Sequence, residues 1–362
     1  MNLKTDIKRK KTTYAIAAFV IIFVVVLVIF FSSIFSNHTI KNIFTAESGK
    51  NYKMVNYNKN IAVVDYDGAN VIDSSGEIKY KIEYHMGTPR MDISDKYMLL
   101  YDKGGRSYSL YKNGEEIYKN TSDMTINFAK TNKNGYVILT TDETGYNSRV
   151  SVISPAGKTE YIWKIGDGYL VDIDISPNNK NIAAAIITTD SGLINENIVF
   201  VNTDKEIETN RVSSEGSMPI SIDYSDSGMV TVVSDNRLCG YSSAGELKWT
   251  VSYESKLLNM FDVDKSGNVV LALSGIKNNT IIETYTKNGR KSGEYTTDSA
   301  ITSINVNGKY IIFTEKNKAS VMNYYGKVLN SHEFTREYKD SVILDKNEIV
   351  LLRNDGIDLL KM

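Results

Sequence analysis

The chain has 362 residues, of which 42% are hydrophobic and 23% charged, so most of it is expected to fold as one large domain or two ordinary ones. The formal net charge of −1 argues against a general nucleic-acid-binding surface. The single cysteine, Cys239, excludes an intramolecular disulfide framework and is expected to pack as a small apolar side chain in a strand.

Residues 14–31 are the first strong signal, an apolar run of eighteen residues that reads YAIAAFVIIFVVVLVIFF. As a helix that rises about 1.5 Å per residue, the run would span about 27 Å, close to the hydrocarbon thickness of a bilayer. A cleaved signal peptide is the alternative, but its apolar core runs only about 7–15 residues and precedes a small-x-small cleavage site, which is missing here. We therefore predict an uncleaved transmembrane helix over residues 14–35.

The charge beside this helix predicts its orientation. Residues 1–13 carry five basic side chains and one acidic side chain. Because basic flanks tend to stay in the cytoplasm, the N-terminus is expected inside the cell membrane and the rest of the chain outside the cytoplasm. The expected divisions are a cytoplasmic basic tail at 1–13, the transmembrane helix at 14–35, a juxtamembrane segment with a closing strand at 36–52, and a repeat domain at 53–362.

Eight short apolar runs recur along the remaining chain at intervals of 36 to 48 residues. Each run is too short for a core helix and too continuous for a strand with one solvated face, so each predicts a strand that is covered on both faces. The runs begin at Ile61, Tyr97, Tyr136, Ile182, Val230, Val269, Tyr310 and Ile349.

A glycine turn follows most of these runs at a similar distance. Glycine adopts the positive φ that a tight hairpin needs at the least cost, so each such turn predicts a hairpin. Lys205 takes the glycine position in one unit and implies a different or strained turn there. The hairpin glycines are Gly76, Gly114, Gly157, Gly245, Gly289 and Gly326.

A polar turn also precedes each apolar run, as in SPNNKN at Ser176 and SDSG at Ser225, so each unit predicts four antiparallel strands. Four-stranded units of about 40 residues that stack face to face describe an all-β fold, the β-propeller. The last unit has only three strands before the chain ends, and a bare sheet edge is unfavourable. We therefore predict eight blades, with residues 38–48 as the fourth strand of the last blade. Seven blades is the alternative.

Two motifs resemble known propeller repeats. GYSSAGELKWTV, and more loosely SPAGKTEYIWKI, resembles the repeat of quinoprotein-like propellers, in which a turn glycine leads to a strand tryptophan. IDISPNNKNIAAA resembles the turn of WD-repeat and TolB-type propellers. The overall layout resembles an uncharacterised family of bacterial, mainly clostridial, single-pass membrane-anchored proteins.

The chain departs from the quinoprotein pattern in two respects. Trp163 and Trp249 are its only tryptophans, so most blades lack the quinoprotein docking residue. One cysteine cannot supply the adjacent cysteine pair of the alcohol-oxidising quinoproteins. The resemblance therefore implies a non-enzymatic propeller without pyrroloquinoline quinone, comparable with scaffolds that assist envelope assembly.

Few residues carry a chemical signature. His38, His85 and His332 fall in different units and have no metal-like neighbour at short spacing. DVDKSGN at Asp262 imitates the opening of a calcium loop, but its twelfth position is Leu273 instead of the required glutamate. No glycine-rich loop opens a helix. No catalytic, cofactor-binding or metal-binding residue is predicted.

A ligand site in a propeller is expected where the loops between blades converge at one end of the central channel. Four such loops are candidates, at 84–90, 165–169, 213–219 and 253–256. Their candidate binding residues are Tyr84, His85, Arg90, Asp167, Tyr169, Glu215, Met218 and Glu254.

The sequence is thus interpreted as an extracytoplasmic binding or scaffold module that is not an enzyme and needs no cofactor. Its expected partners are the cytoplasmic membrane, through the N-terminal helix, and a protein or cell-wall component. One alternative is an envelope enzyme that acts on glycan or peptide through loop carboxylates, for which two carboxylates about 5–10 Å apart in the channel mouth would be the sign. A ligand sensor is the other alternative.

Overall fold

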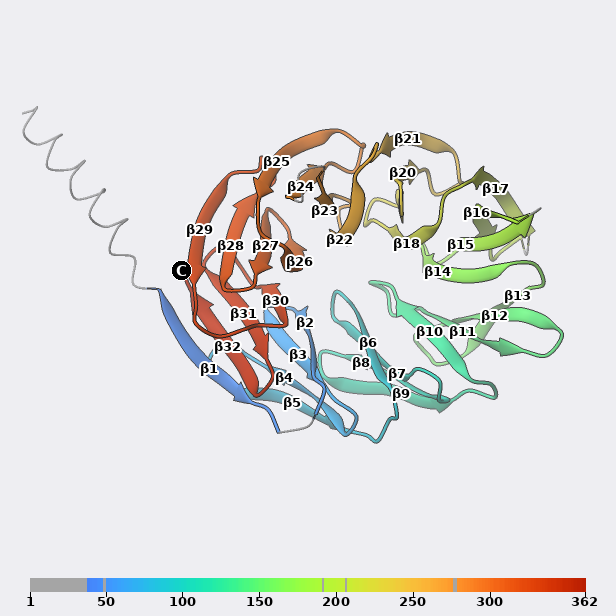
Figure 1. Cartoon of the computed structure of the whole chain (residues 1–362). Coiled ribbons are helices and arrows are strands. Elements are labelled where there is room, and N and C mark those ends of the chain that lie inside the picture. The colour runs from blue at the N-terminus through green and yellow to red at the C-terminus, as the bar shows by residue number, and fades with distance from the viewer. Residues whose placement is uncertain (1–37, 48–49, 191, 206, 276–278) are drawn as a thin grey trace, which may run out of the picture. The chain divides into compact units, whose positions relative to one another are not determined.

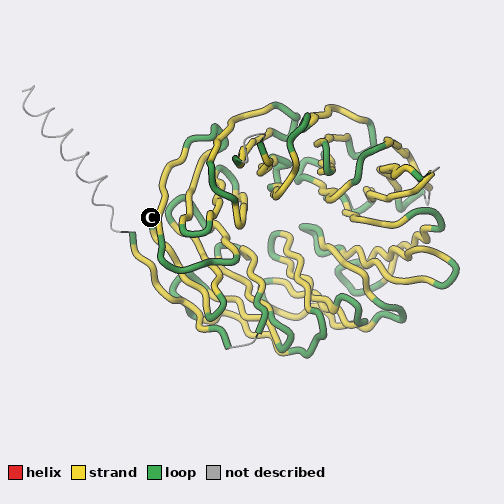
Figure 2. Tube along the Cα trace, in the orientation of Figure 1, coloured by secondary structure: helices red, strands yellow, loops and turns green. Residues whose placement is uncertain are grey.

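The computed structural model describes residues 38–47, 50–190, 192–205, 207–275 and 279–362. Within them the regular structure is β-strand, and the strands are joined by turns and loops (Figure 2). Residues 40–361 form one compact unit, in which eight four-stranded sheets follow one another around a central channel (Figure 1). The unit is a β-propeller.

In each blade the chain runs from the channel outward. The innermost strands of blades 1 to 8 are β2 (Lys53–Tyr57), β6 (Pro89–Ser94), β10 (Ile126–Thr131), β14 (Tyr169–Ile175), β18 (Pro219–Tyr224), β22 (Leu257–Val263), β26 (Ile301–Asn307) and β30 (Asp340–Ile343). The second strands are β3 (Asn60–Val64), β7 (Tyr97–Asp102), β11 (Val137–Glu143), β15 (Asn181–Asp190), β19 (Val230–Ser234), β23 (Val269–Ser274), β27 (Tyr310–Glu315) and β31 (Glu348–Arg353).

The two outer strands complete each sheet. The third strands are β4 (Gly68–Ile72), β8 (Ser107–Lys112), β12 (Tyr146–Ile153), β16 (Leu193–Asn202), β20 (Arg237–Tyr241), β24 (Thr280–Tyr285), β28 (Lys318–Asn323) and β32 (Gly356–Lys361). The outermost strands are β5 (Ile78–Glu83), β9 (Glu115–Thr121), β13 (Thr159–Ile165), β17 (Ile207–Glu215), β21 (Leu247–Ser252), β25 (Lys291–Thr297), β29 (Val328–Glu333) and, in blade 8, β1 (Thr39–Thr45).

The eight apolar runs form the second strands, and both of their faces are covered as predicted. In β7, Met98 and Leu100 pack with blade 1, whereas Leu99 on the opposite face packs with blade 3. All three side chains are fully buried. Because successive side chains of a strand point to opposite faces, a continuous apolar run is what a sheet between two other sheets requires.

The predicted eight blades and the N-terminal closing strand are confirmed. Strand β1 lies beside β32, so the chain's first described strand completes its last sheet (Figure 1). The amide of Ala46 donates to the carbonyl of Asp355 at 3.1 Å, just beyond the paired strands. Ile43 in β1 is buried in the core that blades 8 and 1 share. The closing strand therefore covers a sheet edge and also contributes to the core.

The predicted hairpin glycines join the third and outermost strands and have positive φ, as Gly114 does at 84°. They also contact the preceding blade. An added Cβ at Gly114 would overlap the ring of Tyr80, and one at Gly289 would overlap the ring of Trp249. The aromatic residue stands four positions after the turn glycine of its own blade, so tyrosine takes the place of the quinoprotein tryptophan in blade 1. The docking position is therefore also filled by an aromatic side chain in a blade that has no tryptophan.

The turn at Lys205 is built differently, as its sequence predicts. The Lys205 amide donates to the carbonyl of Asn202 at 3.2 Å and to its Oδ1 at 3.1 Å. Lys205 itself has no positive φ. The Asn202 side chain therefore stabilises a turn that lacks the hairpin glycine.

The predicted tail at 1–13 and transmembrane helix at 14–35 lie outside the described residues. In the part of the chain that the structure describes, no helix is long and apolar enough to cross a membrane. Cys239 lies in β20 and is buried, as expected, and burial raises the pKa of its thiol.

Candidate functional site

Aspartates on the innermost strands hold neighbouring blades together along the channel. In the described part of the chain each blade is a separate four-stranded sheet, so the inner strands of neighbouring blades meet through contacts other than sheet pairing. The Oδ2 atom of Asp92 in blade 2 accepts from the amide of Thr131 in blade 3 at 2.7 Å. Asp174 in blade 4 accepts from the amide of Tyr224 in blade 5 at 2.7 Å. Blades 6 and 7 are joined by the same kind of contact, through Asp262.

Asp262 in blade 6 accepts from the amide of Val306 in blade 7 at 2.7 Å and from the Nδ2 atom of Asn305 at 3.1 Å. The calcium-like DVDKSGN segment is thus explained by structure. Asp264 accepts from the amides of Ser266 and Asn268, both at 2.8 Å, and so closes the hairpin turn.

One lysine joins three blades inside the channel. The Nζ atom of Lys130 in blade 3 lies 2.8 Å from Asp172 of blade 4 and 3.3 Å from Asp223 of blade 5, and donates to the Ile222 carbonyl at 3.1 Å. Burial alone would lower the pKa of Lys130, but the surrounding carboxylates raise it well above its ordinary value. The lysine is therefore a charged bridge between three inner strands.

Burial raises the pKa of several channel carboxyls. It raises the pKa of Asp92 to about 6, that of Asp262 to about 7 and that of Asp174 to about 8. It also raises the pKa of Asp172. Desolvation disfavours the charged form and outweighs the backbone amides and Lys130, which favour it. The pKa values of Asp92, Asp262 and Asp174 therefore lie nearer to neutral pH than that of an ordinary carboxyl, although the contacts of these groups are structural.

Two polar cavities lie at the end of the channel where the first and second strands join. Their volumes are about 770 Å³ and 320 Å³, and Asp95 and Lys265 line both. Neither Asp95 and Lys265 nor the inner-strand aspartates Asp92, Asp172 and Asp174 were predicted from the sequence as site residues. For the inner-strand aspartates the available signal is an acidic residue in the strand before an apolar run, as in MDIS and VDIDIS.

The eight predicted binding residues belong to the opposite end of the channel. We call this end the loop face: it carries the connections between blades and the turns between second and third strands. In an antiparallel blade these turns lie at the end where the innermost strand starts. Exposed Asp167, Tyr169, Glu215, Met218 and Glu254 lie on this face over blades 3 to 6.

The other three predicted residues belong to blades 1 and 2 of the same face. Tyr84 donates from its hydroxyl to the carbonyls of Asp65 at 3.0 Å and Gly68 at 2.9 Å. His85 is exposed, with Nδ1 3.4 Å from Asp67. Arg90 is half-buried in β6. The loop residues therefore occupy one face, but in two groups.

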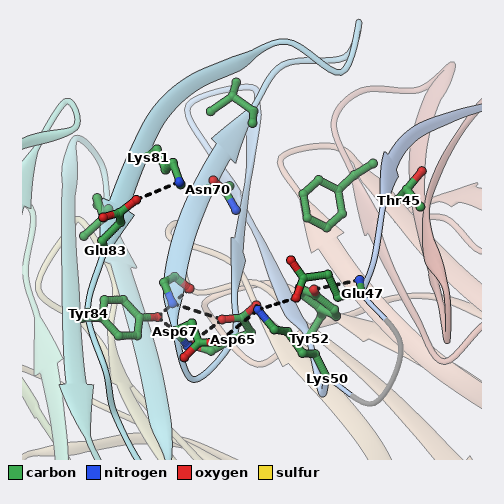
Figure 3. Close-up of a pocket in the computed structure, with 14 residues that line it drawn as sticks. Thr45, Glu47, Lys50, Tyr52, Asp65, Asp67, Asn70, Lys81, Glu83 and Tyr84 are labelled. Carbon is green, nitrogen blue, oxygen red and sulfur yellow. Dashed lines mark hydrogen bonds and ion pairs between the residues drawn. The ribbon is translucent and has the colours of Figure 1, made fainter.

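Tyr84 also lines a cavity of about 700 Å³ beside the closing strand, which Figure 3 shows. At its charged end, Lys50 lies within 3.0 to 3.2 Å of carboxylate oxygens of Glu47, Asp65 and Asp67 (Figure 3). The hydrogen bonds that the Lys50 ammonium donates to these carboxylates raise its pKa. The Lys50 ammonium is thus paired with the protein's own carboxylates. The apolar part of the cavity lining includes Phe44.

Among the described residues, no group of three or more histidine, cysteine, aspartate or glutamate side chains is placed to hold a metal ion.

The comparisons with known proteins assign the chain to a family. Residues 32–362 match a family described as "Family of unknown function (DUF5711)", and the chain belongs to it. No curated protein matches the chain by sequence.

Several solved structures share the fold. The C-terminal WD40 domain of Sif2 is 11% identical, with a TM-score of 0.63, and the match covers 89% of this chain and 98% of that chain. BamB from Moraxella catarrhalis is 12% identical, with a TM-score of 0.53 and coverage of 90% and 98%. The Cps50 (Swd1) β-propeller domain of Myceliophteria thermophila is also 12% identical, with a TM-score of 0.52 and coverage of 90% and 100%. At such identities the likeness shows the fold alone.

Proposed function

We propose that the protein is a non-catalytic binding or scaffold module, held by a helix over residues 14–35 at the outer face of the cytoplasmic membrane. The propeller would recruit a protein or cell-wall partner. The observation that carries the proposal is the exposure of Asp167, Tyr169, Glu215, Met218 and Glu254 at one end of a closed ring. A ring whose blades are joined by buried contacts is a rigid support for binding loops.

The contacts of the channel carboxylates favour binding over catalysis. Asp172 and Asp223 share the ammonium of Lys130, and Asp172 also accepts from the Ile222 amide at 2.9 Å. A glycosidase needs one carboxyl as a proton donor and another as a base or nucleophile, both directed at substrate. Here the carboxylate oxygens of Asp172 and Asp223 hold neighbouring strands together, so we assign these aspartates a structural role.

The charge of the N-terminus supports the proposed location. The eighteen apolar residues at 14–31 follow a basic tail, and a basic flank favours the cytoplasmic side. Protease added to intact protoplasts should digest the propeller and leave the tail. Protection of the propeller from external protease would overturn the location.

A photo-crosslinking amino acid at position 169 of the full-length chain tests the binding role in living cells. Tyr169 is 74% exposed on the loop face, and the matched control is Tyr325, which is 79% exposed in the turn between β28 and β29 at the opposite end. Crosslinks to a protein or wall component from position 169 alone are expected. Adducts with lipid or with the chain itself only, or equal adducts from both positions, would contradict the proposal.

A further inference from the structure

The loop face carries a group of exposed apolar side chains over blades 4 to 6. They stand where the innermost strands begin and at the tip of the hairpin between β15 and β16. Their exposed fractions range from 38% to 74%. We call them the mouth patch: Tyr169, Leu193, Ile194, Met218, Ile220 and Leu257.

Hydrogen bonds link the loops that carry the mouth patch, both within blade 4 and between blades 4 and 5. Ile194 at the hairpin tip accepts from the amide of Gly216 at 3.0 Å. The carbonyl of Gly216 accepts from the Nδ2 atom of Asn236 in blade 5 at 2.8 Å. The carbonyl of Asn236 accepts in turn from the amide of Tyr253, in the connection that leads to Leu257. The loops are thus fixed to one another and present a preformed surface.

The hairpin between β15 and β16 of blade 4 projects from the loop face. Strands β15 and β16 have ten residues each, and their pairing continues to Asp190 and Leu193. The innermost strand begins only opposite Ile187. The hairpin therefore extends three residues beyond β14, or about 10 Å at the rise of a strand. It forms a wall beside Tyr169 and leaves two apolar side chains exposed near its tip.

Among the described residues, the exposed charged side chains around the mouth patch that have no ion-pair partner are all acidic. Asp167, Asp235, Glu215 and Glu254 are exposed there, and none of them forms an ion pair with a described residue. The basic groups nearby are already neutralised. Their ion pairs are Lys164 with Glu143 at 2.7 Å, Arg237 with Glu196 at 2.5 Å and Lys256 with Glu283 at 2.8 Å.

An apolar surface with an acidic border fits a partner of the opposite charge. We propose that the mouth patch binds a basic amphipathic polypeptide segment of a partner protein, in which lysine or arginine flanks apolar side chains. The inference rests on the proposed binding function and specifies the partner's chemistry. Apolar contacts would supply affinity, and the acidic border would select the charge. A second copy of the same patch and an anionic lipid surface both carry negative charge and would be repelled.

The test uses the full-length chain in phosphatidylcholine nanodiscs and a fluorescein-labelled peptide of leucine and lysine. The peptide has about 14 residues at amphipathic spacing, or four helical turns. Fluorescence anisotropy should show binding that weakens as salt is added, because exposed charges are screened. A peptide with glutamate in place of lysine should not bind. Equal binding of both peptides, or binding of neither, would overturn the proposal.

Variants locate the binding site. Leu257→Ser and Tyr169→Ser should each weaken binding about tenfold, as expected for an apolar anchor. Tyr325→Ser, at the opposite end, should change nothing. The double variant Glu215→Gln with Glu254→Gln should reduce the salt dependence. Peptide binding that ignores the mouth-patch variants would place the site elsewhere and refute the inference.

Two further measurements address other occupants. Self-association in analytical ultracentrifugation that Leu257→Ser abolishes would identify a second copy of this chain and overturn the proposal. Flotation with phosphatidylglycerol vesicles that depends on Leu257 would identify lipid and do the same. A partner crosslinked at position 169 in cells, combined with peptides that do not bind, would refute this inference and leave the proposed function standing.

Discussion

Lys130 illustrates how single residues fix the arrangement of the blades. Its side chain is 21% exposed and contacts Asp172 and Asp223 from two successive blades. A buried ion pair is weak support for stability as a whole, since both charges lose hydration. Removing one member, however, leaves the other charges buried without compensation.

Lys130→Met keeps most of the apolar length of the side chain and removes the ammonium. We expect the free energy of unfolding in guanidinium chloride to fall by about 3–5 kcal/mol, since Asp172 loses its buried cation. Lys133→Met is the matched control, because Lys133 pairs with exposed Asp226 at 3.4 Å. Exposed pairs contribute about 0–1 kcal/mol. Similar losses in both variants would show that Lys130 does not bridge the blades.

The residues that could be predicted from the sequence are those whose role depends on their neighbours in the chain. A turn glycine such as Gly114 needs positive φ, so its role is visible from its neighbours in the chain. Asp174 is different, since its partner Tyr224 is 50 residues away and belongs to another blade. The sequence predicted Tyr169 and Met218 as binding residues from loop position but missed Leu257, because an apolar residue at a strand end resembles core. Only the assembled ring shows it to be 69% exposed.

At the scale of elements, outermost strands pack against the glycine hairpin of the next blade. Tyr80 of β5 lies against Gly114, and Tyr118 of β9 lies against Gly157. The Nε1 atom of Trp249 in β21 donates to the Lys287 carbonyl at 3.0 Å beside Gly289. The recurring spacing of 36 to 48 residues was sufficient to predict blades, because each blade repeats the same contact with its neighbour.

Gly114→Ala tests this contact. Both Gly114 and Gly145 have positive φ, at 84° and 81°, so alanine strains the backbone of either turn. Only at Gly114 would the new methyl group meet a ring, that of Tyr80, while Gly145 has nothing nearby. We expect thermal unfolding to show a loss of about 1 kcal/mol for Gly145→Ala and about 2–4 kcal/mol for Gly114→Ala. Equal losses would mean that the ring moves aside freely.

The closing strand β1 is a second element whose contribution can be measured. Ile43 is 7% exposed in the core shared by blades 8 and 1, whereas Ile40 on the same strand is 41% exposed. Ile43→Asp buries a charge without a partner and should cost about 3 kcal/mol or more of unfolding free energy.

Ile40→Asp is the control and should change the unfolding free energy by less than about 0.5 kcal/mol. Limited proteolysis should also release the N-terminal segment faster in Ile43→Asp than in Ile40→Asp. If both variants unfold like the unsubstituted chain, β1 does not close the ring in solution. The sequence predicted this strand from the three-stranded remainder at the C-terminus, a long-range inference that the need to cover a sheet edge made possible.

At the scale of the whole molecule, the ring encloses carboxylates on blades 2, 4 and 6. Each contacts the following blade through a backbone amide. The inner strands are thus linked by groups that titrate, and stability should depend on pH in a direction opposite to that of exposed ion pairs. Glu143 shows the ion-paired case, since its hydrogen bond with Lys164 lowers its pKa. That contribution is present at neutral pH and is lost only in acid.

Asp92, Asp262 and Asp174 have pKa values raised from 3.8 to about 6, 7 and 8. Between pH 4 and these values the folded chain holds protons that the unfolded chain has released, so raising the pH favours unfolding. Each such group contributes up to about 1.4 kcal/mol per pH unit. The free energy of unfolding, measured in guanidinium chloride, should therefore decrease from pH 5 to pH 8. Asp262→Asn removes one titrating group and should flatten the decrease between pH 5 and pH 7. A free energy that is constant or rises over this range would show that the channel carboxyls are already ionised at pH 5.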